Sequence, residues 1–232
     1  MVQKHTVADP QPAMRRAPVR RAPKTELEPE PVPRVPLAKL RREAATCTRC
    51  PLYQNATQTV FGEGPDDARL VVVGEQPGDR EDRAGAPFVG PAGALFDRAL
   101  ADAGIPRDTV YVTNAVKHFK HQPRGKRRIH QKPNAGEVRA CKWWLDRELA
   151  TIRPALVVAL GSTAAQSLAG RAVSVMKERG PADFQGRAGF ITVHPSLLLR
   201  LPDADRKAEE YRRFVADLRR IRAMMEKLGA AA

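Results

Sequence analysis

The chain has 232 residues, which is enough for one globular domain with a buried core and an additional tail. Its 40 Lys and Arg residues outnumber its 26 Asp and Glu residues, and the resulting net charge of +14 favours a polyanionic partner, most simply nucleic acid. No apolar run is long enough to span a bilayer and the N-terminus lacks the apolar core of a signal peptide, so we expect a cytoplasmic protein with no membrane partner.

The first 36 residues are rich in Pro, Arg and Lys and contain almost no large apolar side chains. Such a segment cannot bury enough apolar surface to offset the entropy lost on ordering, so we predict a disordered basic tail over residues 1–36. Its arginines fit either a solvated tail or sequence-independent contacts with phosphates. Residues 37–232 are predicted to form one folded domain.

Strand and helix patterns alternate through this domain. Continuous or nearly continuous apolar runs predict four strands, over residues 70–73, 109–113, 155–160 and 190–193. Helical periodicity predicts helices over residues 37–45, 91–103, 135–149 and 162–168, followed by an amphipathic C-terminal helix. Because strands that alternate with helices form parallel sheets, the sequence predicts a three-layer α/β/α sandwich with a central, mainly parallel four-stranded sheet.

Polar residues follow three of the predicted strands, at the edge where ligands bind in open α/β sheets. They are residues 75–79, Asn114 and residues 194–196. The stretch 69–93 also places Phe88 on a loop between Gly and Pro residues, so we take it as the core of a candidate active site. Asn114 carries a donor and an acceptor and can pair with an amide-like edge of a base, although an ordinary turn Asn fits as well.

The segment Lys117–Lys132 contains seven Lys or Arg residues and no acidic residue. A charge run of this density is typical of a solvated loop or of a nucleic-acid contact. His130 follows Ile129, at the end of three consecutive cations, Lys126, Arg127 and Arg128. Nearby cations lower the pKa of an imidazole, so we expect these three residues to keep His130 neutral and nucleophilic.

The three cysteines form no even disulfide set, and Cys47 and Cys50 are separated by two residues. In a reducing compartment this spacing favours metal or cluster ligation or redox chemistry. Cys141 is the third soft ligand, and His118 is the natural fourth because it lies just beyond the second predicted strand. By spacing alone, a zinc site with three Cys and one His is the first choice, and an iron–sulfur cluster stays open.

With these residues assembled, residues 37–220 resemble the iron–sulfur uracil-DNA glycosylases of the family-four type. The resemblance rests on motifs that occur in this order: Cys47-x-x-Cys50, Gly74-Glu75-x-Pro77-Gly78, Glu81-Asp82, Pro87-Phe88-Val89-Gly90, Thr113-Asn114 and His194-Pro195-Ser196. Gln76 stands where that family usually has a small residue, and Lys126-Arg127-Arg128-Ile129-His130 lies in an extra loop. Both features are similar to the UdgX subfamily, whose members stay covalently attached to DNA after excising uracil.

The resemblance implies a role for most of the candidate residues. Phe88 would stack on a uracil rotated out of the DNA, Asn114 would read its edge, and His194 would stabilise negative charge on the leaving base. His130 would attack the sugar carbon C1′, and Glu75 would orient His130 or accept its proton. The remaining catalytic candidates are Gln76, Asp79 and Asp82, of which the two aspartates would position water in an ordinary glycosylase. The remaining DNA-contact candidates are Lys126, Arg127, Arg128, Ser196 and Arg200.

The family has Cys where this chain has His118, so the resemblance implies a [4Fe–4S] cluster held by Cys47, Cys50, Cys141 and His118. We therefore predict a monomeric DNA-repair enzyme that releases free uracil from single- and double-stranded DNA and becomes irreversibly linked to the abasic site through His130. One alternative is a conventional glycosylase that turns over and releases abasic DNA. Another is an iron–sulfur or zinc module that binds nucleic acid without chemistry.

Overall fold

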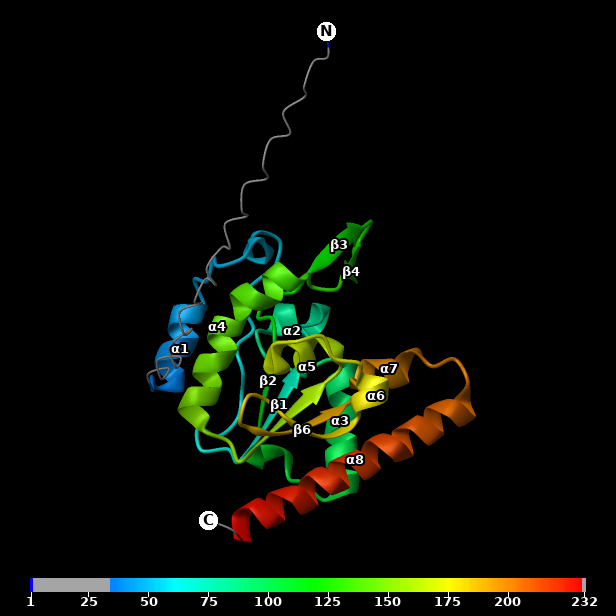
Figure 1. The fold of residues 1–232 in the computed structure, drawn as a ribbon. Helices are drawn as coiled ribbons and strands as arrows, with labels where there is room; N and C mark the ends of the chain where they lie inside the picture. The colour runs from blue at the N-terminus through cyan, green and yellow to red at the C-terminus, as the bar shows by residue number, and fades with distance from the viewer. Residues whose placement is uncertain (2–33, 231–232) are drawn as a thin grey trace. The chain divides into compact units, whose positions relative to one another are not determined.

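The computed structural model describes Met1 and residues 34–230. The predicted disordered tail therefore lies almost entirely outside the described residues. In the described part, a central five-stranded sheet separates two layers of helices (Figure 1). The predicted three-layer α/β fold with a mainly parallel sheet is confirmed.

The order of strands in the central sheet is β2-β1-β5-β7-β6. The first four strands run parallel and correspond to the four predicted ones, and each is built from residues that are almost all buried. Their bounds are β1 Leu70–Gly74, β2 Val110–Asn114, β5 Leu156–Leu160 and β7 Ala188–Thr192. The fifth strand, β6 (Gly180–Asp183), pairs antiparallel with β7 at one edge. We did not predict it, because a short segment with Gly and Pro carries no strand pattern.

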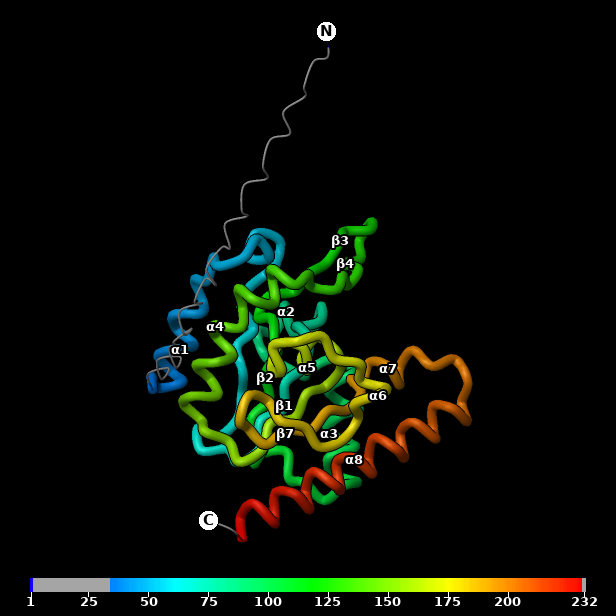
Figure 2. Tube along the Cα trace, in the orientation of Figure 1, coloured from blue at the N-terminus to red at the C-terminus, as the bar shows by residue number. Residues whose placement is uncertain are grey.

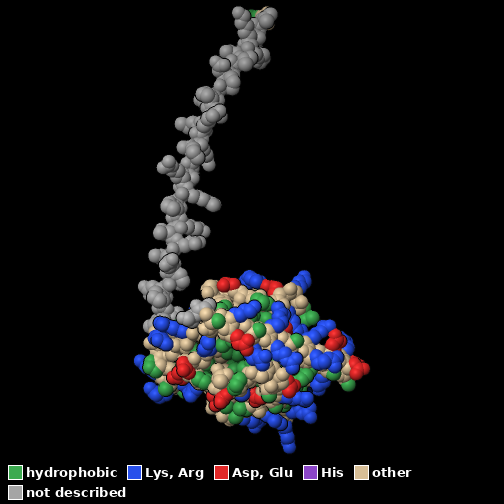
Figure 3. All heavy atoms as spheres, turned by 90° about the horizontal axis from the view of Figure 1, so that it is seen from below, with side chains coloured by type: hydrophobic (Ala, Val, Ile, Leu, Met, Phe, Trp, Pro, Cys, Tyr) green, Lys and Arg blue, Asp and Glu red, His purple; other side chains and the backbone are tan. Residues whose placement is uncertain are grey.

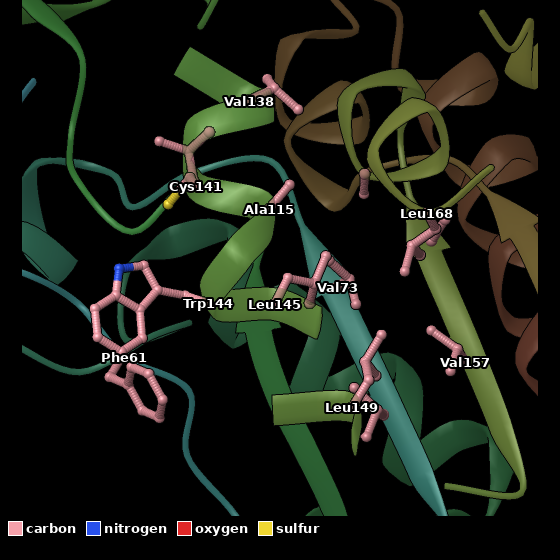
Figure 4. Close-up of a cluster of buried hydrophobic side chains, with 14 of the residues drawn as sticks. Phe61, Val73, Ala115, Val138, Cys141, Trp144, Leu145, Leu149, Val157 and Leu168 are labelled. Atoms are coloured by element: carbon pink, nitrogen blue, oxygen red, sulfur yellow. The ribbon is translucent and has the colours of Figure 1, made fainter. Parts of the chain in front are cut away.

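Successive residues of each parallel strand point to opposite faces of the sheet, and each face is covered by its own helices. One face packs against α1 (Leu37–Ala44), α4 (Ala135–Ile152) and α5 (Ser162–Ala169). In Figure 4, Leu145 and Leu149 of α4 point toward Val73 of β1. This face buries Val71 and Val73, whereas the opposite face buries Leu70 and Val72.

The second face is covered by α3 (Pro91–Ala103), α7 (Pro195–Arg200) and the long C-terminal helix α8 (Ala204–Ala230). Helix α8 buries Phe214, Leu218 and Ile221 from the predicted apolar stripe. Among the described residues, no helix has the length and apolar character that crossing a membrane requires. The remaining short helices are η1 (Pro51–Gln54), α2 (Asp79–Ala84), η2 (Arg107–Thr109) and α6 (Val175–Glu178).

The basic segment between β2 and α4 forms a separate β-hairpin, which we expected to be an irregular loop. Its strands are β3 (His121–Arg124) and β4 (Arg127–His130), and Gly125 at the turn has a φ of 58°. The hairpin projects above α2 and α4 (Figure 2). Apart from His121 and Arg128, which are partly buried, its residues are exposed, so its pairing is not driven by burial of an apolar face.

Candidate active site

A pocket of about 1000 Å³ opens at the carboxyl edge of the parallel strands. Residues that follow all four parallel strands line it: Glu75 after β1, Asn114 at the end of β2, Gly161 after β5 and His194 after β7. The structure thus brings the three predicted polar sets together. The candidates that line the pocket are Glu75, Gln76, Asp79, Phe88, Asn114, His130, His194, Ser196 and Arg200.

Asn114 and Phe88 meet at Gly74, the last residue of β1. A Cβ atom at Gly74 would lie 2.4 Å from Asn114 Oδ1 and 3.0 Å from the tip of the Phe88 ring, so only Gly leaves room for both side chains. Phe88 has a φ of 60°, an unusual conformation for a residue with a side chain, and its ring lies 5.4 Å from that of Phe96. This strained position directs an aromatic ring into the pocket wall.

His194 lies two residues beyond the end of β7 and caps α7. Its Nδ1 atom accepts a hydrogen bond from the backbone N–H of Ser196 at 3.2 Å, and the Ser196 hydroxyl lies 2.9 Å from the same nitrogen. Burial is the main cause that lowers the pKa of His194 to about 4, and the cation of Arg200 and the titratable ring of His130 add to it. The ring is therefore neutral at pH 7 and carries its proton on Nε2, where it can donate a hydrogen bond.

Glu75 lies between two side chains from different elements. Its Oε1 atom lies 3.4 Å from Nε2 of His130, and its Oε2 atom accepts a hydrogen bond of 2.5 Å from the hydroxyl of Thr163. Thr163 was not among our candidates, although Gly161 and the start of α5 follow a buried strand in the same way as the predicted polar sets. The position of His130, half exposed at the end of β4, places its imidazole at the pocket.

The pKa of His130 is lowered, as we predicted, but for a different reason. Burial is the main cause, the cation of Arg200 adds to it, and the carboxylate of Glu75 opposes both. The predicted effect of Lys126, Arg127 and Arg128 is therefore wrong. The first two are exposed on the hairpin, and the charge of Arg128 is compensated by two carboxylates.

Gln76 joins the two ends of the β-hairpin. Its side-chain amide donates to the carbonyl oxygens of Lys120 and Gln131, at 3.2 and 3.0 Å, and its Oε1 atom accepts from the N–H of Lys120 at 3.0 Å. These two residues flank the hairpin directly. Gln76 therefore fixes the segment that carries His130 relative to the end of β1.

Arg128 makes a second anchor between the hairpin and α2. Its guanidinium contacts Asp79 at 2.5 Å and Asp82 at 2.6 Å, and it also donates to the hydroxyl of Thr57. Asp82 is fully buried, accepts the backbone N–H of Thr57 and does not line the pocket. This arrangement favours an anchoring role for Arg128 and Asp82 over the phosphate contact and the water positioning that we predicted.

The pocket rim also carries residues that sequence reasoning did not single out. Arg80 and Lys132 are exposed cations at the rim, and Met176 on α6 is 75% exposed. Arg200 lies 3.4 Å from the Ser196 hydroxyl. Only the density of Lys and Arg hinted at the first two, and no sequence signal marked Met176.

The three cysteines are buried and lie close enough to influence one another. Burial and the proximity of Cys47 raise the pKa of Cys50, and burial raises the pKa of Cys141 to about 12. Cys47 accepts a hydrogen bond from the indole N–H of Trp144. Figure 4 shows Cys141 and Trp144 on successive turns of α4. Three soft thiol ligands thus gather where α1 and α4 pack.

His118 offers a nitrogen lone pair that has no hydrogen-bond partner among the described residues. The hydroxyl of Thr59 donates to the carbonyl oxygen of Ala44 and therefore accepts from Nε2–H of His118 at 2.9 Å. This leaves Nδ1 deprotonated, buried and unpaired. In residues 34–230, no group of three or more His, Cys, Asp or Glu side chains is arranged to hold a metal ion. In donor chemistry, however, three thiols and an imidazole fit an iron–sulfur cluster.

Comparison with known proteins assigns the chain to a family. Residues 61–219 match the model of the uracil DNA glycosylase superfamily. The chain belongs to the uracil DNA glycosylase superfamily. It is 41% identical over 187 residues to a type-4 uracil-DNA glycosylase of Thermotoga maritima, covering 79% of this chain and 91% of the relative. A type-4 enzyme of Pyrobaculum aerophilum is 37% identical over 175 residues, covering 72% and 86%, and one of Sulfurisphaera tokodaii is 33% identical over 184 residues, covering 75% and 80%.

All residues that line the pocket belong to the part of the chain that matches the superfamily. The matched region contains all four parallel strands and the whole β-hairpin, so it includes each residue that lines the pocket. Cys47 and Cys50 precede the matched region, whereas His118 and Cys141 lie within it. The pocket at the carboxyl edge of the sheet thus lies entirely within the matched region and is the candidate active site of this superfamily domain.

Proposed function

We propose that this protein excises uracil from DNA and becomes covalently attached to the abasic site through His130. Uracil excision is supported by superfamily membership and by the similarity to type-4 uracil-DNA glycosylases. The attachment rests on one observation, the position of His130. The hairpin brings its imidazole to the pocket, beside Glu75, and two separate anchors hold the hairpin there.

Recognition of the base is proposed to depend on Phe88 and Asn114. A uracil rotated into the pocket can stack on the Phe88 ring, while the Asn114 amide pairs with its N3–H and O4. Cytosine presents the opposite donor and acceptor at these two positions. It would leave buried polar groups unpaired, at a cost of about 1–3 kcal/mol per group.

Departure of the base is proposed to depend on His194. As the bond between C1′ and uracil N1 breaks, its electron pair moves onto the uracil, and negative charge grows on O2. The Nε2–H of His194 is free to donate a hydrogen bond to that oxygen, since Nδ1 is occupied by the N–H of Ser196. A neutral donor suits this role, because it stabilises the anion without needing a proton transfer.

Capture of the sugar is proposed to occur at His130. A ring nitrogen donates its lone pair to C1′ as uracil leaves, and the proton of the imidazole passes to Glu75 and finally to the uracil anion. The products are one molecule of uracil and a histidine–DNA bond, so no water or oxidant is consumed. Thr163 helps to hold the carboxylate of Glu75 in place.

The proposal is tested by incubating the protein with a uracil-containing single strand and separating the products on a denaturing gel. A band that resists heat and SDS, absent with a thymine strand, is the expected result. Free abasic DNA that alkali cleaves would instead identify a conventional glycosylase. Unchanged DNA would identify a binding module.

The chain offers a matched control for the nucleophile. His121 lies opposite His130 in the hairpin register, but its Nε2 atom is bonded to the carbonyl oxygen of Asn55 and it does not line the pocket. We expect His130→Ser to release uracil and free abasic DNA without a stable band, and His121→Ser to keep the band. A stable band in His130→Ser would mean that another residue is the nucleophile.

We further propose that Cys47, Cys50, Cys141 and His118 hold a [4Fe–4S] cluster. The burial of the thiols and the unpaired Nδ1 atom of His118 support this ligand set. When bound, such a cluster would cross-link the segment that follows α1 to α4 and to the end of β2. None of the four residues lines the pocket, so we propose that the cluster stabilises the fold and takes no part in excision of the base.

A further inference from the structure

A closed network of buried polar side chains adjoins the pocket at Asn114. Lys117 and Glu148 are both completely buried and form an ion pair of 2.5 Å. The ammonium of Lys117 also donates to the hydroxyl of Thr113 at 2.6 Å and to the backbone carbonyl oxygen of Asn114 at 2.8 Å. Its three N–H bonds are therefore all used, and none is directed into the pocket.

Glu148 is held in place from the other side. Its Oε1 atom accepts the hydroxyl of Tyr111 at 2.8 Å and the backbone N–H of Gly62 at 3.1 Å, and the hydroxyl of Thr113 lies within 3.1 Å of both of its oxygens. These bonds fix the carboxylate, and the carboxylate fixes Lys117. The network thus joins α4 to β2.

Asn114 occupies the point where regular pairing of β2 ends. On one side, the backbone N–H of the next residue, Ala115, donates to the carbonyl oxygen of Gly74 in β1. On the other side, the ammonium of Lys117 holds the carbonyl oxygen of Asn114 itself. The backbone of the base-reading residue is therefore fixed from both directions, and its side chain can project into the pocket without a support of its own.

The buried ion pair between Lys117 and Glu148 is not explained by a contribution to the stability of the fold. A buried pair costs desolvation that its own attraction only partly repays, and a well-packed apolar pair of the same volume is often as stable. A buried ammonium has one property that an apolar side chain lacks, which is the ability to orient a carbonyl group.

We propose that Lys117, held by Glu148, is a positioning residue that fixes Asn114 for recognition of the base. This inference rests on the proposed uracil excision and adds a residue that does not touch the substrate. The position of Asn114 matters for the rate, because a misplacement of about 1 Å in an active site can reduce a rate by about 100-fold.

The test is the double variant Lys117→Met/Glu148→Gln. It removes both buried charges and the donor to Asn114. The amide oxygen introduced at position 148 can still accept from Gly62 and Tyr111, so we expect the fold to be retained. We expect the single-turnover rate constant for uracil excision to fall by about 100-fold. We expect unchanged affinity for a strand without uracil, and the iron content should stay that of the unmodified protein.

A matched control makes the same chemical changes at the surface. Lys39 and Glu43 form an exposed pair of 3.8 Å on α1, and Lys39→Met/Glu43→Gln should leave the rate constant unchanged. The single-turnover rate constant distinguishes a positioning role of Lys117 from a purely stabilising one. A purely structural role would lower the fraction of active molecules and leave the rate constant of the remaining ones as it was.

The outcomes distinguish this inference from the function on which it rests. An unmodified protein that releases no uracil overturns the proposed function. A folded double variant with a rate constant within about threefold of the unmodified protein overturns the role of Lys117. If the double variant does not fold, NMR of the unmodified protein decides. A scalar coupling between Lys117 Nζ and the carbonyl carbon of Asn114 supports the role, and a rapidly exchanging ammonium without this coupling overturns it.

Discussion

At the scale of single residues, the site depends on backbone positions that leave space for two side chains at once. Gly74 is the clearest case, because the Asn114 amide and the Phe88 ring both lie where its Cβ would be. Phe88 itself adopts a φ of 60°. Strain of this kind is retained where the surrounding structure determines it and function requires it.

Gly74→Ala tests this crowding. The added methyl group must displace Asn114, Phe88 or both, so we expect uracil excision to slow by about 100-fold while the circular dichroism spectrum stays the same. Gly136→Ala, at the start of α4, is the control, since only the end of the Asn134 side chain lies near its Cβ. Wild-type excision in Gly74→Ala would show that the pocket tolerates the shift.

The pH dependence of the covalent bond is a second prediction at this scale. The pKa of His130 lies below its ordinary value, so the imidazole is neutral at pH 7 and loses its lone pair only as the pH falls through that lowered pKa. Arg200→Gln removes a cause of the lowering and should move the midpoint of adduct formation to higher pH. Glu75→Gln removes the opposing charge and should move it to lower pH.

The measurement is the initial rate of adduct formation on denaturing gels across a pH series. Both variants alter pocket residues, so only the midpoint is compared and not the maximum rate. Shifts in the same direction for both variants, or no shift in either, would contradict the electrostatic account of His130. The lowered pKa also means that the unfolded chain binds this proton more readily, so it contributes to loss of stability at acid pH.

At the scale of elements, the β-hairpin of β3 and β4 is held by side chains from elsewhere rather than by its own packing. Gln76 binds both of its ends, and Arg128 binds Asp79 and Asp82. An isolated two-stranded hairpin is marginally stable at best in water. The position of His130 is therefore decided by these anchors.

Arg127 and Arg128 form a matched pair for testing the anchors. Arg128→Ala leaves the buried carboxylate of Asp82 without its cation and frees the hairpin, so adduct yield should fall by at least about tenfold while uracil release continues. Arg127 is exposed and forms no ion pair among the described residues. Arg127→Ala should weaken DNA binding in a salt-dependent way and leave the adduct yield at saturating DNA unchanged.

Product analysis at low and high salt distinguishes the two effects. Equal behaviour of the two variants would mean that Arg128 acts as another phosphate contact, which was our interpretation from the sequence. A loss of uracil release in Arg128→Ala would mean that the anchor also shapes the base pocket.

At the scale of the whole molecule, positive charge is distributed rather than confined to the active site. On the face shown in Figure 3, Lys and Arg side chains lie scattered among acidic and apolar ones. The net charge of +14 therefore favours a general attraction to DNA, and we propose that the exposed cations of the pocket rim, among them Arg80 and Lys132, determine where the strand is held.

Metal removal is the prediction that belongs to this scale. Stripping iron should lower the thermal midpoint of the folded domain, because bound ligands stabilise only the native state. His118→Cys should retain iron, and His118→Ala should reduce the iron content. Iron assays and visible absorbance give the readout independently of activity. A colourless, fully active protein with one equivalent of zinc would refute the cluster.

Local sequence patterns were enough to predict the layers of the fold and the edge of the sheet at which the pocket lies. Uninterrupted runs of mostly β-branched residues such as Leu70–Val73 favour a strand buried on both faces, and parallel strands bring their carboxyl ends to one edge. For this reason the strand pattern alone is enough to group Glu75, Asn114 and His194. The antiparallel β6 was missed, because its pairing depends on a neighbouring strand rather than on a pattern of its own.

Which side chains pair with one another depends on contacts between distant segments, and local patterns did not predict it. Arg127 and Arg128 are indistinguishable in sequence, yet one faces solvent and the other binds two carboxylates that lie over 40 positions earlier in the chain. Likewise, Lys117 looks like one more cation of a basic segment, and burial against Glu148 makes it a support for Asn114. Burial and charge pairing arise from contacts between distant segments, and no local pattern contains them.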